Sequence, residues 1–195
     1  METTPWEVNA KSISDKYIAG FLDGDGSIIA GIEKRPDRHR FPYRVRLKIN
    51  FTQHVRHKNM LILLGKALGN IGAIRFVATH NLAELVIQKR SDVRATLERL
   101  LPHLILKQRQ ARIMLAMIDI FNQNIVNSRS TLSDKDFEKL FAMAKELRSI
   151  NSGAGGKKSY EIVNPVTTYS EKSGVASRIE VANTLAPDNC VGKKT

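Results

Sequence analysis

Cysteine is almost absent from this chain of 195 residues, which contains only Cys190. A single thiol excludes an intramolecular disulfide framework and a zinc site built from cysteines. Long apolar runs are also missing, because no stretch approaches the roughly 18 apolar residues that a membrane span needs. We therefore expect a globular protein that is stabilised by a hydrophobic core and has no membrane partner.

Acidic residues are scarce relative to basic ones. The chain has 31 Lys and Arg against 19 Asp and Glu, and its formal net charge is +12. Nine of the basic residues fall between Lys34 and Lys58, where Asp37 is the single acid. Such a basic stretch is typical of nucleic-acid-binding proteins. A solvated face and a patch for anionic membranes are the alternatives, but neither explains why the charges recur at strand spacing.

Residues 17–28 are the most informative stretch of the chain. Ser12 or Ser14 can cap a helix upstream, and the pattern predicts a helix through Tyr17–Leu22 that breaks at residues 23–26. Glycine in a helix interior costs up to roughly 1 kcal/mol relative to alanine, so glycines in this helix require a packing reason.

This helix has two unusual features. Its small residues Ala19, Gly20 and Gly24 share one strip, where another backbone can approach closely. Its carboxylates Asp23 and Asp25 stand at the C-terminal end, where the partial negative charge of the helix disfavours them unless a cation or a hydrogen-bond donor compensates.

A calcium-binding EF-hand loop is one alternative for this segment. With Gly26 as the turn glycine, the first and last ligand positions fall on Phe21 and Ile32, which offer no side-chain oxygen. This excludes the EF-hand. An ordinary turn between a helix and a strand remains the alternative for the Asp-Gly pair alone.

Alternation of apolar and polar residues predicts four β-strands after this helix. The residues predicted to face the core are Ile28, Ala30, Ile32, Val45, Leu47, Ile49, Phe51, Ile74, Phe76, Ala78, Ala83, Leu85 and Ile87. The residues predicted to face outward are Ile29, Gly31, Glu33, Arg35, Arg44, Arg46, Lys48, Asn50, Arg75, Val77, Thr79, Glu84, Val86 and Gln88. Arginine can bridge guanine and asparagine can bridge adenine in the major groove, so the outward face is a candidate DNA-binding surface.

Further helices are predicted at residues 58–69, 92–101, 106–122 and 134–149, with Ser91 and Ser133 as caps of the second and the fourth. The order predicts an α+β fold with an antiparallel four-stranded sheet. We expect a core domain at residues 1–150. Residues 151–195 form a basic, glycine-rich loop, a possible short helix at 174–185 and a flexible tail.

The segment Tyr17–Gly26 closely resembles the LAGLIDADG motif of homing endonucleases. Phe51–Gln53 and Leu106–Ala111 resemble two further segments of the single-motif branch of that family, and the resemblance covers residues 13–150. It implies an αββαββα fold whose sheet forms a saddle over double-stranded DNA. The nearest second motif, residues 116–119, lacks the Gly-Asp-Gly turn.

A single motif implies a C2 homodimer in which the motif helices pack at the axis, through Ala19, Gly20, Asp23 and Gly24. Such a dimer would read a long, roughly palindromic site, because the symmetry of the site mirrors that of the protein. The resemblance also implies that Asp23 caps the neighbouring motif helix.

The family implies roles for individual residues. Asp25 and the carbonyl of Gly24 would hold Mg²⁺, Gln53 would orient a water molecule, and Lys107 would stabilise the transition state. Mn²⁺ is expected to substitute, and Ca²⁺ to bind without supporting cleavage. His57 occupies a position where relatives carry arginine or lysine, so either His57 or the adjacent Lys58 could provide this positive charge, whereas His54 fits an exposed loop.

The resemblance and the outward face together imply a set of DNA contacts. To the outward residues from Ile29 to Val86 we add Arg38 and Arg40 from the loop between the first two strands. Lys157 and Lys158 of the glycine-rich loop are expected to touch phosphates.

The leading prediction is a site-specific, Mg²⁺-dependent double-strand DNA endonuclease with no small-molecule cofactor. The alternative is a non-cleaving nucleic-acid binder, either an intron maturase or a transcription regulator. An RNA-binding module is disfavoured, because the outward strand positions have no aromatic residue for base stacking. The first seven residues match no targeting signal, and we expect an intracellular protein, organellar if an organelle intron encodes it.

Overall fold

The computed structural model of the chain describes residues 13–34, 43–126, 129–130 and 132–151. All of them belong to one unit, Met1–Glu161. Arg35, Arg38, Arg40, Lys157 and Lys158 lie outside the described residues, as does the helix predicted at 174–185, so these remain predictions.

The described elements follow the predicted order, which is αββαββα and then two further helices. They are α1 (Asp15–Asp25), β1 (Gly26–Lys34), β2 (Tyr43–His54), α2 (Lys58–Ala67), β3 (Ala73–Val77), β4 (Leu82–Ile87), α3 (Arg90–Leu100), α4 (Gln108–Gln123) and α5 (Asp134–Asn151). Short 3-10 turns occupy Val55–His57, Ala78–His80 and Leu101–His103. A small hairpin of β5 (Ile125–Val126) and β6 (Arg129–Ser130), which the sequence did not predict, precedes α5.

The four long strands form one antiparallel sheet with the order β1-β2-β4-β3. Its register places Ile28, Ile49 and Ile87 side by side on adjacent strands, and all three are fully buried. The apolar alternation therefore lies on one face, as predicted, because residues two apart point to the same side of a strand.

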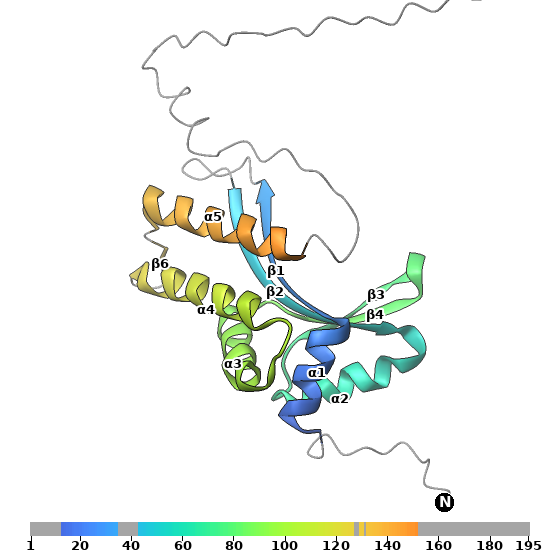
Figure 1. Cartoon of the computed structure of the whole chain (residues 1–195). Coiled ribbons are helices and arrows are strands. Elements are labelled where there is room, and N and C mark those ends of the chain that lie inside the picture. Colours follow the sequence, from blue (N-terminus) through green and yellow to red (C-terminus); the bar gives the residue numbers. More distant parts are fainter. Residues whose placement is uncertain (1–12, 35–42, 127–128, 131, 152–195) are drawn as a thin grey trace, which may run out of the picture. The chain divides into compact units, whose positions relative to one another are not determined.

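The helices cover that apolar face (Figure 1). Ile18 and Leu22 of α1, Leu61 of α2, Leu97 of α3 and Met114 of α4 are all fully buried in the core cluster. Figure 1 shows a curved sheet whose other face carries no described helix. None of the described helices has the length and apolar character that a membrane crossing requires.

Side-chain caps explain where two of the helices begin. Ser14 accepts a hydrogen bond from the Tyr17 amide at 3.2 Å, and Ser133 accepts one from the Asp136 amide at 3.1 Å. The predicted cap Ser91 is wrong, because α3 begins one residue before it. The Ser91 hydroxyl instead donates to the Asp92 carboxylate at 2.9 Å.

The third strand differs from its prediction at three residues. β3 ends at Val77, so Ala78 and Thr79 lie in a 3-10 turn and not on the faces of the sheet. Phe76 pairs with Ala83 on the core side, but it is 57% exposed. The reason is its position on the edge strand of a hairpin that projects past the helices (Figure 1).

Candidate active site

Asp25 is the last residue of α1 and is exposed where the chain enters β1. The Gln53 side-chain amide, near the end of β2, donates a hydrogen bond of 2.8 Å to Asp25 Oδ2. The fold thus brings together two predicted site residues that lie 28 positions apart in the chain.

Lys107 joins these residues from the N-cap position of α4. Its ammonium group donates to the main-chain oxygen of Asp23. Burial lowers the pKa of Lys107 from its ordinary value, against the opposing attraction of the Asp23 and Asp25 carboxylates. The three predicted residues Asp25, Gln53 and Lys107 therefore form one cluster at the end of α1.

Asp23 is a buried carboxylate that completes a turn of its own chain. Its two oxygens accept hydrogen bonds from the amides of Ile105, Leu106 and Lys107 at 2.6, 3.2 and 2.9 Å. The prediction that Asp23 caps the motif helix of a second subunit is therefore wrong. The end of α1 packs against the connection before α4, and this connection supplies the donors that a carboxylate at a helix C-terminus needs.

The small-residue strip of α1 is open only at its glycines. Ala19 is fully buried within its own chain, so its assignment to a contact with another subunit is not supported. Gly20 and Gly24 are exposed, and a Cβ built on either meets no atom within 4 Å. Tyr17 is 51% exposed and stacks on Phe21 at 6.5 Å between ring centroids.

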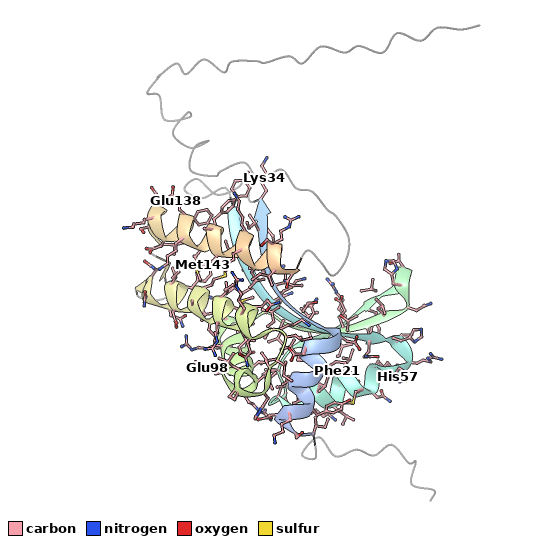
Figure 2. All side chains as sticks on the ribbon, in the orientation of Figure 1. Phe21, Lys34, His57, Glu98, Glu138 and Met143 are labelled. Carbon is pink, nitrogen blue, oxygen red and sulfur yellow. The ribbon has the colours of Figure 1, made fainter. Side chains whose placement is uncertain are left out.

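His57 ends the 3-10 turn after β2 and is exposed, like Lys58. Figure 2 labels His57 at the β2–α2 connection and Phe21 on the neighbouring α1. The two side chains line one open hollow together with Gln53, so His57 lies on the same side of α1 as the cluster. His54 instead accepts a hydrogen bond from the Arg56 amide at 3.2 Å, which stabilises the turn.

Two apolar residues beside the cluster were missed by sequence analysis. Ile105 is 83% exposed and Leu106 is 73% exposed, directly before Lys107. The sequence contained a sign of this exposure. Both residues precede the first residue of α4, and neither belongs to the apolar face of that helix.

The uncovered face of the sheet carries the predicted cations, but several of them are paired. Arg46 lies 3.3 Å from the Glu33 carboxylate, and Arg75 makes a two-nitrogen contact with Glu84 at 2.5 and 3.0 Å. Lys48, on the same face, has no carboxylate partner in the described part of the chain. The described cations therefore include both neutralised and available charges.

Asn50 and Val86 are less accessible than predicted. They are direct partners on the two central strands, and their exposures are 5% and 8%. Asn50 Oδ1 is buried and has no hydrogen-bond partner among the residues that the structure describes. Ile29, Gly31 and Val77 keep partial exposure on the same face. Within the described residues, no group of three or more His, Cys, Asp or Glu residues is arranged to hold a metal ion.

Known proteins share both this sequence and this fold. A family model described as LAGLIDADG endonuclease matches residues 18–104. The DNA endonuclease I-CvuI of Chlorella vulgaris is 30% identical over 141 residues, which cover 68% of this chain and 86% of that protein. The DNA endonuclease I-CreI of Chlamydomonas reinhardtii is 33% identical over 103 residues, which cover 53% of this chain and 61% of that protein.

Solved structures agree with this likeness. The homing endonuclease I-CvuI, crystallised with its target in 2 mM Ca, matches with a TM-score of 0.69 and 26% identity over 84% of this chain and 96% of that one. The archaeal intron-encoded homing endonuclease I-Vdi141I, complexed with DNA, shares the fold with a TM-score of 0.63 and 21% identity, covering 80% of this chain and 92% of that one.

A relative with 30% identity is matched over 86% of its length, and the family model covers both the motif of α1 and the sheet that α1 supports. The chain therefore belongs to the LAGLIDADG endonuclease family.

Proposed function

We propose that this protein is a site-specific endonuclease that cuts both strands of a long, roughly palindromic DNA target as a homodimer. The observation that carries the proposal is the cluster of Asp25, Gln53 and Lys107 at the exposed end of α1. Relatives named DNA endonucleases, one of them crystallised with its DNA target, support the choice of substrate.

The homodimer is supported by the exposed outer side of α1. Tyr17, Gly20 and Gly24 are exposed along one strip, and the glycines leave room for the backbone of a second helix. Ile105 and Leu106 expose apolar surface nearby, which a partner would remove from water. A C2 contact through this strip would bring two copies of Asp25 together at the axis.

The residues present fit a divalent cation. Mg²⁺ typically takes one or two protein carboxylates and fills its other positions with water and phosphate oxygens. Asp25 is exposed and could supply such a carboxylate from each subunit, with the Gly24 carbonyl beside it. We expect Mn²⁺ to replace Mg²⁺, and Ca²⁺ to support binding without cleavage.

The mechanism assigns a task to each side chain of the cluster. The Gln53 amide donates to Asp25 Oδ2 and holds this carboxylate in place, while the carbonyl oxygen of the same side chain would orient the attacking water. Lys107 offers a positive charge to the phosphate as negative charge develops in the transition state. Bound divalent cations would polarise the phosphate and stabilise the leaving oxygen.

His57 could provide further positive charge beside the cluster. It is exposed and lines the hollow that Gln53 also lines. Lys58 is the alternative source of this charge, because it is adjacent and equally exposed.

The uncovered face of the sheet is the proposed DNA surface. Arg44, Arg46 and Lys48 alternate along β2 on this face, at a spacing that suits phosphates and base edges of the major groove. Ile29, Gly31 and Val77 on the same face would contribute apolar or shape contacts.

A non-cleaving binder, such as a maturase or a regulator, is the second candidate. It would need the DNA surface but no organised cluster, so the Gln53–Asp25 hydrogen bond and the adjacent Lys107 favour the enzyme. The division at residue 150 and an organellar location are further parts of the proposal that rest on the sequence.

The test is incubation of the full chain with a library of long duplexes in Mg²⁺ and, separately, in Ca²⁺. We expect double-strand cuts in Mg²⁺ and binding without cuts in Ca²⁺. Tight binding of one duplex with no cut in Mg²⁺ or Mn²⁺ would favour the binder. A monomer in sedimentation with bound DNA would refute the shared site.

A further inference from the structure

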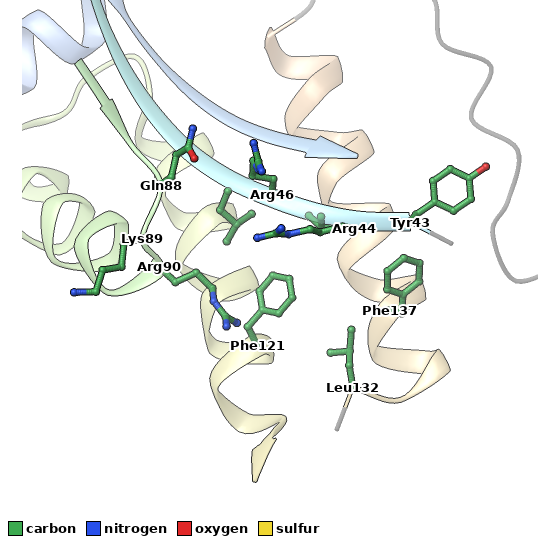
Figure 3. Close-up of a pocket in the computed structure, with 11 residues that line it drawn as sticks. Tyr43, Arg44, Arg46, Gln88, Lys89, Arg90, Phe121, Leu132 and Phe137 are labelled. Atoms are coloured by element: carbon green, nitrogen blue, oxygen red, sulfur yellow. The ribbon is translucent and has the colours of Figure 1, made fainter. Parts of the chain in front are cut away.

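A difference in strand length leaves a notch at the edge of the sheet. β4 pairs with β2 from Ile49 to His54, so in the described structure Tyr43–Lys48 of β2 have a strand neighbour only in β1. After β4 ends at Ile87, the chain passes through Gln88 and Lys89 into α3. An open hollow of about 480 Å³ lies at this place (Figure 3).

The hollow is lined by cations from two separate elements. Arg44 and Arg46 come from β2, while Lys89 precedes α3 and Arg90 is its first residue. None of the residues that line the hollow is acidic. In Figure 3, Arg90 extends to the Phe121 ring, Arg44 extends from β2 into the gap beside the strand, and Lys89 points away from the hollow.

Nearby acids compensate only part of this charge. Arg46 lies 3.3 Å from Glu33, and Lys89 lies 3.6 Å from Asp92. Arg44 and Arg90 have no carboxylate partner among the described residues. The notch therefore holds an excess of positive charge, which favours an anionic ligand.

The Arg90 guanidinium is held so that its donors remain available. Its central carbon lies 4.8 Å from the centre of the Phe121 ring. The Phe121 ring attracts this cation but offers no oxygen or nitrogen acceptor, so the contact leaves the N–H groups of Arg90 for the oxygens of a phosphate. Gln88 adds an uncharged amide to the same wall.

The cations continue along the end of β4. Lys89 and Gln88 also line a second hollow, which includes Arg75. A row of donors that passes from Arg90 through Lys89 toward Arg75 suits a chain of phosphates better than a single small anion, because each strand of DNA carries a charge at roughly 3.4 Å intervals.

We infer that Lys89 and Arg90, with Arg44, form a clamp for the phosphodiester backbone of duplex DNA at the edge of the sheet. This inference rests on the proposed function and extends its DNA surface beyond Val86, into the connection before α3. Contacts with phosphates carry no sequence information, so the clamp would supply affinity and fix the register of the sheet on the duplex.

The test compares the salt dependence of DNA binding in Lys89→Gln/Arg90→Gln and in the wild-type chain, with Ca²⁺ present. Each phosphate contact adds about 0.9 to the slope of log affinity against log salt concentration. We expect the slope of the double variant to fall by about 1.8 for each bound subunit, equally for duplexes of different sequence.

Lys16→Gln/Lys66→Gln is the matched control, because it removes two exposed lysines from α1 and α2 on the helical side of the sheet. The slope of this control should equal that of the wild type. Lys89→Gln alone is a second variant that should fold normally, since the Lys89 side chain is 77% exposed. Its slope should fall by about half as much as that of the double variant.

A double variant whose slope matches the control would overturn the clamp while leaving the proposed function intact. The same would follow if the slope fell for an RNA hairpin but not for a DNA duplex. A wild-type chain that binds no duplex at low salt would overturn both proposals.

Discussion

The two sides of α1 differ in how completely their own chain surrounds them. On the inner side, Ile18, Ala19 and Leu22 are fully buried, and Asp23 receives three backbone donors. On the outer side, Tyr17, Gly20 and Gly24 are exposed. One face of α1 is thus buried by its own chain, and the other face is exposed.

The two carboxylates at the end of this helix show what the difference means. Asp23 and Asp25 are two residues apart, yet one is buried under amides of its own chain and the other is exposed beside a single amide from Gln53. A carboxylate with three donors is satisfied and serves the fold. A carboxylate with one donor keeps lone pairs for a cation, and it is suited to chemistry.

The largest expected effect concerns the exposed acid. Asp25→Asn should lower the single-turnover rate of DNA cleavage by about 10³-fold or more, because it removes the charged metal ligand. Binding in Ca²⁺ and the melting temperature should change little, since Asp25 is exposed. A variant that still cleaves at close to the wild-type rate would contradict the contrast between the two acids.

The buried acid should act on stability instead. Asp23→Ala leaves the amides of Ile105, Leu106 and Lys107 without their acceptor. We expect the free energy of unfolding in denaturant to fall by about 3 kcal/mol. Asp25→Ala is the control and should change it by less than about 0.5 kcal/mol. Equal losses in the two variants would remove the distinction.

A substitution at the exposed Gly20 tests whether the outer side of α1 is a subunit contact. Gly20 is exposed and a Cβ added there meets no atom within 4 Å, so the monomer of Gly20→Gln should fold at least as well, helped by the higher helix propensity of glutamine. In a dimer the added side chain would separate the helices and weaken association by about tenfold or more. Sedimentation measures this, with the exposed Ala95→Gln of α3 as control.

The smallest expected effect concerns Lys107, whose pKa both acids influence. It should appear in the pH dependence of the cleavage rate. Because burial lowers the pKa of Lys107 below the ordinary value of a lysine, the ammonium group should lose its proton at a lower pH than an exposed lysine does. As the pH rises, the cleavage rate should therefore begin to fall before the ordinary pKa of lysine is reached. The fall should be at most roughly tenfold per pH unit.

The stability of the fold should increase over the pH range in which the cleavage rate falls. The unfolded chain holds the Lys107 proton more tightly, so the free energy of unfolding should rise with pH between the folded and unfolded pKa values. Lys107→Arg, which stays charged, should remove the alkaline decline if it retains activity. A decline that persists in this variant would assign the titration to another group.

Much of the fold followed from local patterns. The alternation of Val45, Leu47 and Ile49 correctly predicted a strand and its buried face, and Ser14 and Ser133 correctly predicted two helix starts. These signals depend on residues two to four positions apart, so they are legible without the rest of the chain. The motif at Tyr17–Gly26 likewise identified the family.

Other features could not be predicted, because distant segments create them. The donors to Asp23 lie 82–84 positions further along the chain, so sequence alone assigned this acid to a second subunit. Phe76 has the predicted register but is exposed, because none of the described helices reaches the tip of the β3–β4 hairpin (Figure 1). The notch beside Arg44 exists only because β4 is shorter than β2.

The sequence by itself determined the order of the elements, the apolar face of the sheet, the excess of positive charge and the presence of two acids at the end of α1. Those properties are set by periodicity and composition. Only the tertiary structure decided which acid is buried, that Gln53 donates to Asp25 and Lys107 to the main chain of Asp23, and that Ala19 is buried while Gly20 is exposed. The physical reason is that burial and hydrogen-bond donors come from whichever segments the fold brings alongside, and these are remote in the chain.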